Sequence, residues 1–316
     1  MISSDTKYQG NVLLWLSITA FIGLILIQQL VAVTPDSQMT IAFHNAAHTP
    51  WFLCLTLLIW PILKQVTGRE FWQLLIVCGL FALILGIFLE LVQVFTSRQA
   101  SWGDVGLNYF GAISALCFIA MVHEWRNFHR GAALFLLVVA ISLVLMGFRG
   151  VGSIYWLHLK RDSISPVLLA FDGPSAITRR NLGADWEIVI GPSPWTDFAG
   201  KSVAKVTLQT NLRWPGITLA EPYPAWDEYF SLHIHAFLDS DDPIPLTVRV
   251  ETFENRGMDS TVDVSLLRGA NYLTIPISQL IPASGKTNLD VKALYIFSEG
   301  SQAGRNFYLG AIKLSD

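Results

Sequence analysis

Long apolar runs occupy the first half of the chain and constrain its fold more than any other feature. Each has the length of a membrane-spanning helix, which needs about 20 residues to cross the hydrocarbon core of a bilayer. The first run is longer than the apolar region of a signal peptide, which covers about 7–15 residues. We therefore predict a membrane α-helical bundle of about five transmembrane helices. The runs cover residues 12–33, 46–65, 71–95, 104–122 and 131–149.

The rest of the chain has a different pattern. From Asp185 onward, short stretches alternate apolar and polar residues and are separated by turn signals such as Asn255-Arg256-Gly257. Short strands at this spacing are typical of an all-β sandwich or jelly roll. We expect a transmembrane domain over residues 1–150, a connector over 151–175 and a β domain over 176–316. The predicted strands are 186–190, 202–209, 229–237, 246–252, 262–267, 271–276, 291–297 and 306–314.

Basic residues in the short loops predict the orientation of the helices. Lys64 and Arg69 lie between the second and third runs, and Arg126 and Arg130 lie between the fourth and fifth. The loop 34–47 contains neither Lys nor Arg. Short loops rich in Lys and Arg stay on the cytoplasmic side. This pattern predicts a multi-pass protein of the cytoplasmic (inner) membrane, with a cytoplasmic N-terminus and a β domain that is periplasmic or extracellular.

Charge and cysteine usage exclude several classes of function. The formal net charge is -3 and no basic cluster is present, so we predict no nucleic-acid partner. The partner that the apolar runs imply is the lipid bilayer. Cys54, Cys78 and Cys117 all lie inside apolar runs, which gives neither a disulfide framework nor a zinc-ligand spacing. We therefore predict no cofactor and no metal site.

Polar residues interrupt the apolar runs at one predicted end of the bundle. Glu90 and Gln93 share one face of the third helix, and Asp104 and Asn108 share one face of the fourth. Arg98 lies in the loop between them. Ionisable groups inside membrane segments are costly, and they indicate a functional or pairing site by default. These residues are our candidate polar site in the membrane.

Two local patterns flank this candidate site. Residues 101–104, Ser-Trp-Gly-Asp, resemble a helix N-cap with an acidic residue at its third position. His44 and His48 are spaced by four residues near the start of the second helix, which we expect to begin at Pro50. The two histidines have the spacing of zinc ligands on a helix, but the sequence supplies no firm third ligand. His48 joins the candidate site because it belongs to the same predicted end of the bundle.

Three interpretations of this polar site stay open. Glu90 or His48 could act as a general acid or base, or Arg98 could bind a phosphate or polar head group. In the structural alternative, Glu90 and Arg98 neutralise each other while Asn108 and Gln93 bond helices together.

Residues about 10–125 resemble the VanZ-like membrane family. The resemblance rests on Glu90-x-x-Gln93-x-Phe95 followed by Arg98, Ser101, Asp104, Asn108 and Gly111, and on His48 ahead of an apolar helix. The acidic–basic pair usual just before that histidine is replaced here by residues 45–47, Asn-Ala-Ala. The family takes its name from a factor linked to glycopeptide-antibiotic resistance. The resemblance implies a role in glycopeptide tolerance or another function of the cell envelope.

The β domain carries aromatic residues between its predicted strands, where loops commonly hold binding sites. An aromatic ring can stack on the apolar face of a sugar, and a neighbouring carboxylate can bond its hydroxyls. Residues 229–234 and 246–250 are similar to paired strands of carbohydrate-binding jelly-roll modules. In the alternative, these rings lie in the core of the sandwich. The candidate ligand-binding residues are Trp214, Tyr223, Trp226, Asp227 and Tyr229.

These observations favour a membrane protein that presents a β-sandwich able to bind an envelope glycan or a lipid-linked saccharide. The alternative is a membrane-embedded enzyme that acts on a lipid-linked phosphate or sugar through Glu90, His48, Arg98 and Asp104. Whether the protein is an enzyme stays open. A transporter ranks last, because the apolar runs contain no evident inverted repeat or broken helix pair.

Overall fold

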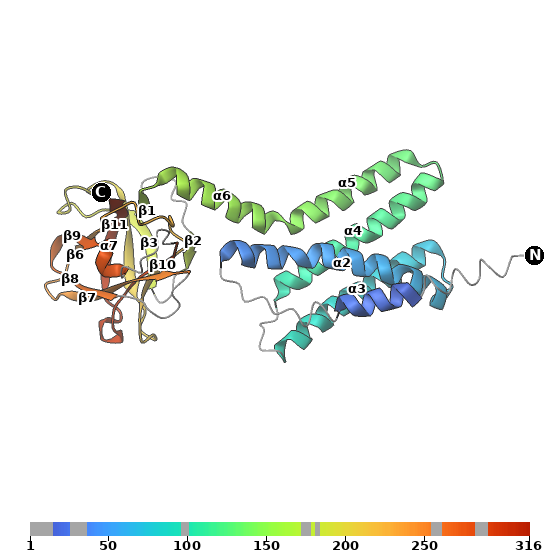
Figure 1. The fold of residues 1–316 in the computed structure, drawn as a ribbon, viewed down its shortest axis with the longest axis horizontal. Helices are drawn as coiled ribbons and strands as arrows, with labels where there is room; N and C mark the ends of the chain where they lie inside the picture. Colours follow the sequence, from blue (N-terminus) through green and yellow to red (C-terminus); the bar gives the residue numbers. More distant parts are fainter. Residues whose placement is uncertain are drawn as a thin grey trace, which may run out of the picture. The chain divides into compact units, whose positions relative to one another are not determined.

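The computed structural model describes residues 15–25, 37–95, 101–171, 178–180, 184–253, 261–281 and 290–316. Arg98 lies outside the described residues, as does most of the first apolar run beyond the helix Trp15–Ile25. The chain divides into two compact units, Met1–Ile154 and Tyr155–Asp316. A helical unit is followed by an antiparallel β-sandwich, which confirms the predicted fold class (Figure 1).

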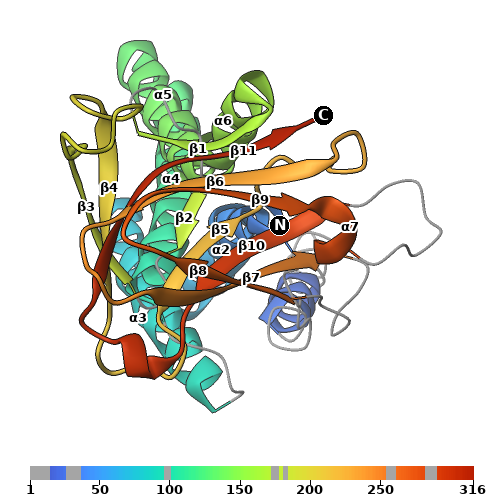
Figure 2. The ribbon, with the colours of Figure 1, turned by 90° about the vertical axis from the view of Figure 1, so that its left-hand side faces the viewer.

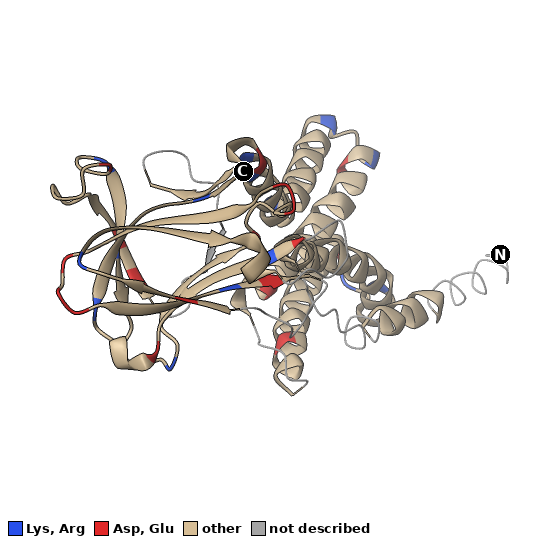
Figure 3. Cartoon of the chain, turned by 60° about the vertical axis from the view of Figure 1, so that its left-hand side comes forward, with Lys and Arg blue, Asp and Glu red and all other residues tan. Residues whose placement is uncertain are grey.

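Within the described residues, four helices are long and apolar enough to cross a membrane. These four helices correspond to the second to fifth predicted apolar runs. As the sequence pattern predicted, Lys and Arg lie at the ends of the helices and not along them (Figure 3). The helices are α2 (Gln38–Thr67), α3 (Phe71–Val94), α4 (Trp102–Arg126) and α5 (Arg130–Gly147).

Helix α2 begins well before Pro50, so the predicted start at that proline is wrong. Ser37 is the N-cap, and its hydroxyl accepts a hydrogen bond from the backbone N–H of Thr40 at 3.0 Å. Pro50 lies inside the helix, where it removes one backbone hydrogen bond. Membrane helices tolerate this loss because neighbouring helices and side chains compensate for it. His44 and His48 therefore belong to a regular helix.

Helix α4 packs against both α2 and α5 through small residues (Figure 1). A Cβ atom added to Gly111 would lie 2.0 Å from the backbone oxygen of Thr49, so only glycine permits this approach. Thr49 also donates a hydrogen bond from its hydroxyl to the carbonyl of Leu107 at 3.1 Å. Ser114 bonds the carbonyl of Ala140 at 2.8 Å. Close backbone contact and interhelical hydrogen bonds are what hold helices together in lipid.

Large apolar side chains cover the surface of the helical unit. On α3 they repeat about every four residues, which places them on one face of the helix. A water-soluble unit would bury such a stripe, whereas a bilayer accepts it. The exposed residues of this stripe include Trp72, Ile76, Leu80, Ile84 and Phe88.

The second unit is a sandwich of two antiparallel sheets (Figure 2). In the described residues, one sheet has the strand order β3-β4-β11-β6-β9, with β1 also paired to β11, and the other has the order β2-β5-β10-β7-β8. The strands are β1 (Val167–Ala170), β2 (Thr178–Arg180), β3 (Ala184–Ile190), β4 (Ser202–Leu208), β5 (Gly216–Ala220), β6 (Ser231–Leu238), β7 (Ile244–Thr252), β8 (Thr261–Leu266), β9 (Gly269–Pro276), β10 (Val291–Phe297) and β11 (Asn306–Ser315).

All of the predicted strands are present, and β1, β2 and β5 are additions to them. The predicted connector over residues 151–175 contains most of helix α6 (Arg149–Ile164) and all of β1. Because β1 pairs with β11, the sandwich begins earlier in the chain than the predicted residue 176. The end of α6 is bonded to the sandwich through His158, whose Nε2 lies 3.0 Å from a carboxylate oxygen of Glu221.

The core of the sandwich lies between the inner faces of the two sheets. Alternating residues supply it, as in β7, where Leu246, Val248 and Val250 point inward and are buried. Helix α7 (Ile277–Leu280) adds further apolar side chains to the same core. This alternation leaves the opposite face of each strand available for other contacts.

Candidate functional site

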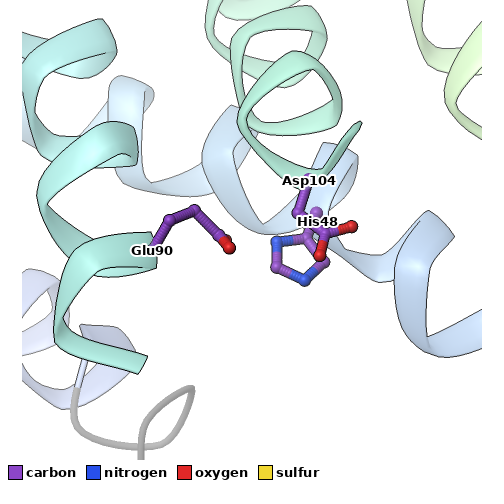
Figure 4. Close-up of side chains that lie close together, drawn as sticks. All are labelled: His48, Glu90 and Asp104. Carbon is purple, nitrogen blue, oxygen red and sulfur yellow. The ribbon is translucent and has the colours of Figure 1, made fainter. Parts of the chain in front are cut away.

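A polar cluster lies where α2, α3 and α4 meet at one end of the helical unit. His48, Glu90 and Asp104 each offer one nitrogen or oxygen atom, and these atoms all lie within 4.8 Å of one another. We call these three residues the His48 cluster. Figure 4 shows the carboxylates of Glu90 and Asp104 beside the imidazole of His48. His48 and Glu90 are only 7% and 3% exposed, so the cluster is largely shielded from its surroundings.

The turn into α4 positions both carboxylates. The hydroxyl of Ser101 accepts hydrogen bonds from the backbone N–H groups of Gly103 at 3.1 Å and Asp104 at 3.4 Å, which confirms the predicted N-cap. The backbone N–H of Ser101 donates to Glu90 Oε2 at 3.2 Å. One residue therefore caps the helix that carries Asp104 and holds the carboxylate of Glu90.

Asn108 orients the histidine. Its Oδ1 lies 2.9 Å from His48 Nδ1, and the Asn108 side chain is 1% exposed. An amide oxygen accepts hydrogen bonds, so Nδ1 is the donor in this pair. Gln93, one turn after Glu90, is also buried at 5% exposure. The described members of the predicted membrane site are thus all buried or close to the His48 cluster.

The cluster combines an imidazole with two carboxylates, a donor set suited to a cation or to proton transfer. His44 is not part of it, although its ring lies edge-on to that of His48 with 6.0 Å between centroids. The sequence pointed to the helix faces that carry Glu90 and Asp104. It also predicted that His48 lies at the same end of the bundle, but the packing of α2 against α4 determines how close His48 comes to the two carboxylates.

The predicted binding residues of the β domain separate into two groups. Trp226 is fully buried, and its indole N–H donates to the carbonyl of Tyr223 at 2.7 Å, so it is a core residue and its predicted role as an open contact is wrong. Burying a large aromatic ring in the core stabilises the fold more than leaving it on a loop surface. Tyr223 and Tyr229 pack against the same core, and only Asp227 of this segment is exposed among the predicted residues. Burial also raises the pKa of the Tyr223 phenol.

Trp214 belongs to a different surface, on the side of the sheet β2-β5-β10-β7-β8 that faces away from the core. There, a hollow of about 420 Å³ is lined by Trp214, Gly216, Ile217, Thr218, Arg249, Tyr295 and Phe297. Trp214 is 48% exposed and meets Phe297 edge-on with 5.8 Å between ring centroids. We call this surface the aromatic face.

Strand register places polar groups beside these rings. Tyr295 of β10 is opposite Arg249 of β7, and the guanidinium carbon lies 5.6 Å from the centre of the tyrosine ring. The Tyr295 hydroxyl donates to Glu251 Oε2 and the Lys292 ammonium donates to Glu251 Oε1, both at 2.7 Å. Burial alone would raise the pKa of the Glu251 carboxyl, but these two hydrogen bonds and the positive charges of Lys292 and Arg249 together lower it. Glu251 is therefore an ionised acceptor.

Sequence reasoning missed Arg249, Tyr295 and Phe297. Their signal was the alternation along the two predicted strands, which puts Tyr295 and Phe297 on the same side of β10. Which side faces the core depends on the partner sheet, and no pattern within one strand determines that.

The chain matches no protein-family model. No curated protein matches it either. Among solved structures, an arabinose-bound α-L-arabinofuranosidase is 12% identical with a TM-score of 0.36, over 47% of this chain and 25% of that one. An exo-β-agarase is 14% identical with a TM-score of 0.35, over 47% of this chain and 24% of that one.

A family 11 carbohydrate-binding module from Clostridium thermocellum, in complex with a β-1,3-1,4-mixed-linked tetrasaccharide, is 17% identical with a TM-score of 0.35. That match covers 48% of this chain and 94% of the module. The chain thus spans about a quarter of the length of the first two structures and nearly all of the module. These comparisons identify no family for the chain.

Proposed function

We propose that the protein is a membrane-anchored glycan-binding protein whose β-sandwich binds saccharide on the aromatic face. The observation that carries the proposal is the hollow formed by Trp214, Tyr295 and Phe297 together with Arg249. Small-molecule sites are concave, mostly apolar, and contain a few placed polar groups. This surface has that composition.

The chemistry of the aromatic face suits a sugar. The C–H groups on one side of a pyranose ring stack on an aromatic ring, which Trp214 offers at 48% exposure. Arg249 and Tyr295 line the hollow, and Arg249 supplies hydrogen-bond donors for ring hydroxyls. The hydrogen bond that Glu251 receives from Tyr295 holds the tyrosine in place before a ligand arrives.

The membrane setting narrows the ligand to saccharides of the cell envelope. Lys64, Arg69, Arg126 and Arg130 flank the turns α2–α3 and α4–α5, which supports a cytoplasmic location for those turns. With those turns in the cytoplasm, α5 leads outward from the α4–α5 turn, so we propose that the β-sandwich lies on the periplasmic or extracellular side. The resemblance of residues 10–125 to the VanZ-like family supports the same setting, and we extend the proposal to glycopeptide tolerance or another envelope function.

The test is binding of the full chain, held in lipid nanodiscs, to an array of envelope saccharides, followed by calorimetric titration of those that bind. Trp214→Ala should weaken binding about tenfold, which corresponds to about 1.4 kcal/mol. Tyr272→Ala is the matched control, because Tyr272 is 50% exposed but lies on β9 in the other sheet. Failure to bind any envelope saccharide, or an equal loss in both variants, would contradict the proposal.

A second candidate function is favoured by the convergence of His48, Glu90 and Asp104. In it, the helical unit is an enzyme that acts on a lipid-linked phosphate or sugar, with His48 or Glu90 as general acid or base. Glu90→Gln should then abolish the growth or resistance phenotype at normal expression. An unchanged phenotype would contradict this second function and would not affect the proposal of saccharide binding.

A further inference from the structure

We propose that His48, Glu90 and Asp104 form a binding site for a divalent first-row transition-metal ion of the Zn²⁺ or Mn²⁺ type. The sequence alone lacked a third ligand beside the two histidines of α2. The structure brings two carboxylates to His48, from helices that are separate in the sequence. The proposal is independent of saccharide binding by the sandwich.

The distances suit coordination. Bonds from Zn²⁺ to nitrogen or oxygen are about 2.0–2.2 Å long, so ligand atoms around one ion lie about 3–4 Å apart. The three donor atoms lie within 4.8 Å of one another, which is close to that spacing. Three protein ligands leave further coordination positions open, as in catalytic zinc sites.

The surroundings of the cluster give a second, independent observation. A metal-bound histidine almost always donates its other ring N–H to a fixed acceptor. Asn108, 1% exposed, places Oδ1 2.9 Å from His48 Nδ1 and so leaves Nε2 as the ligand. The Asn108 amide nitrogen is also buried and has no hydrogen-bond partner in the described part of the chain. The residue that contacts His48 therefore keeps one buried amide donor unsatisfied.

The carboxylates are held in a similar way. Ser101 donates its backbone N–H to Glu90 Oε2 at 3.2 Å, and it caps the helix that carries Asp104. Both carboxylates are thus fixed beside the imidazole of His48. The imidazole selects among ions, because Mg²⁺ and Ca²⁺ prefer all-oxygen sites while Zn²⁺ and Mn²⁺ accept mixed nitrogen and oxygen ligands.

The helical unit contains a matched control. His129 Nδ1 and Glu124 Oε2 lie 2.6 Å apart at the α4–α5 turn, but no third donor joins them in the described residues. A histidine–carboxylate pair by itself is thus present elsewhere in the same unit. Glu124→Gln removes a carboxylate without touching the His48 cluster.

The experiment measures metal content in the full chain, purified in detergent with a tag that contains no histidine. The protein is stripped with a chelator, exposed separately to ZnCl₂, MnCl₂ and MgCl₂, and desalted before elemental analysis. Wild type and Glu124→Gln should keep about one Zn²⁺ or Mn²⁺ per chain and no Mg²⁺. Asp104→Asn and His48→Gln should keep less than about a tenth of that amount.

A variant that leaves all three ligands intact separates coordination from folding. Asn108→Ala should weaken the affinity for Zn²⁺ about 10–100-fold, as for other outer partners of metal ligands. Size-exclusion elution and helical circular dichroism report whether each variant is folded. Two results overturn the proposal: a wild-type chain that keeps no more Zn²⁺ or Mn²⁺ than Asp104→Asn, or an Asn108→Ala variant that binds both ions with wild-type affinity.

Discussion

The two units of the chain distribute polarity in opposite ways. The helical unit exposes large apolar side chains and buries His48, Glu90 and Asn108. The sandwich buries its apolar side chains and leaves charged pairs at its surface, such as Arg268 and Asp241 with side chains 64% and 83% exposed. The same measure of exposure therefore has a different meaning in each unit. In lipid, an exposed leucine is favourable, and a buried polar group indicates a functional or pairing site. In water, an exposed charged side chain is common.

The largest expected effect concerns the core of the sandwich. Trp226→Ala should lower the free energy of unfolding by about 3–5 kcal/mol, because the ring is fully buried and leaves a cavity. Trp214→Ala, at 48% exposure, should change it by about 0.5 kcal/mol or less. Calorimetric unfolding of the full chain in detergent measures both. Similar losses would show that the two tryptophans do not differ in burial as described.

The next prediction compares two isoleucines of equal exposure, Ile84 in α3 and Ile190 in β3, both 66% exposed. Ile84→Lys should disfavour membrane insertion by about 2.5–3.5 kcal/mol, since it places a charge near the centre of a spanning helix. Ile190→Lys should be nearly neutral because a lysine on an edge strand faces water. The fraction of each variant recovered in the membrane after expression is the measurement. Equal recovery of the two variants would contradict the prediction that α3 spans a membrane.

Local patterns in the sequence were enough to predict much of the fold. The apolar runs located α2 to α5, and the Ser101 cap was correct because capping depends on neighbouring residues. Pro50 misled the prediction of the helix start, since the cap at Ser37 and contacts with other helices outweigh one lost hydrogen bond. Strand β5 was missed because residues 217–219 are buried on both sides and follow a Pro-Gly turn signal, so they do not alternate.

The candidate sites depended more on tertiary packing. Helix spacing put Glu90 with Gln93 and Asp104 with Asn108, but the approach of α2 to α4 is decided by Gly111 against Thr49. In the sandwich, the position of Trp226 between predicted strands suggested an exposed ring, but the ring is fully buried in the core. The aromatic face is assembled from three strands distant in the sequence, and single-strand patterns cannot bring them together.

Gly111 allows a direct test of packing in the helical unit. Gly111→Leu should destabilise the unit by about 1–3 kcal/mol or more, because even a Cβ there would lie 2.0 Å from the backbone oxygen of Thr49. Gly106→Leu is the control in the same helix, since a Cβ at that position meets nothing within 4 Å. Thermal stability by size exclusion in detergent distinguishes them. A tolerated Gly111→Leu would mean that α2 and α4 do not approach this closely.

The smallest expected effect concerns a charged group on the surface of the sandwich and its response to pH. The pKa of the Glu251 carboxyl is lowered from its ordinary value of 4.5. Burial raises it, but the hydrogen bonds from Lys292 and Tyr295 and the charges of Lys292 and Arg249 together have the larger effect. A lowered pKa in the folded state contributes stability above the unfolded pKa, and that contribution is lost as the pH falls through the folded pKa.

Glu251→Gln should therefore destabilise the sandwich by about 0.5–1 kcal/mol at pH 7, the size expected of a partly exposed ion pair. The difference from wild type should shrink as the pH is lowered below about 4.5. Glu187→Gln is the control, because its pair with Lys205 is 3.7 Å long and its side chain is 66% exposed. Unfolding of each variant in denaturant across this pH range is the measurement. A difference that grows toward low pH would have the wrong sign, and Glu251 would then be held in its protonated form.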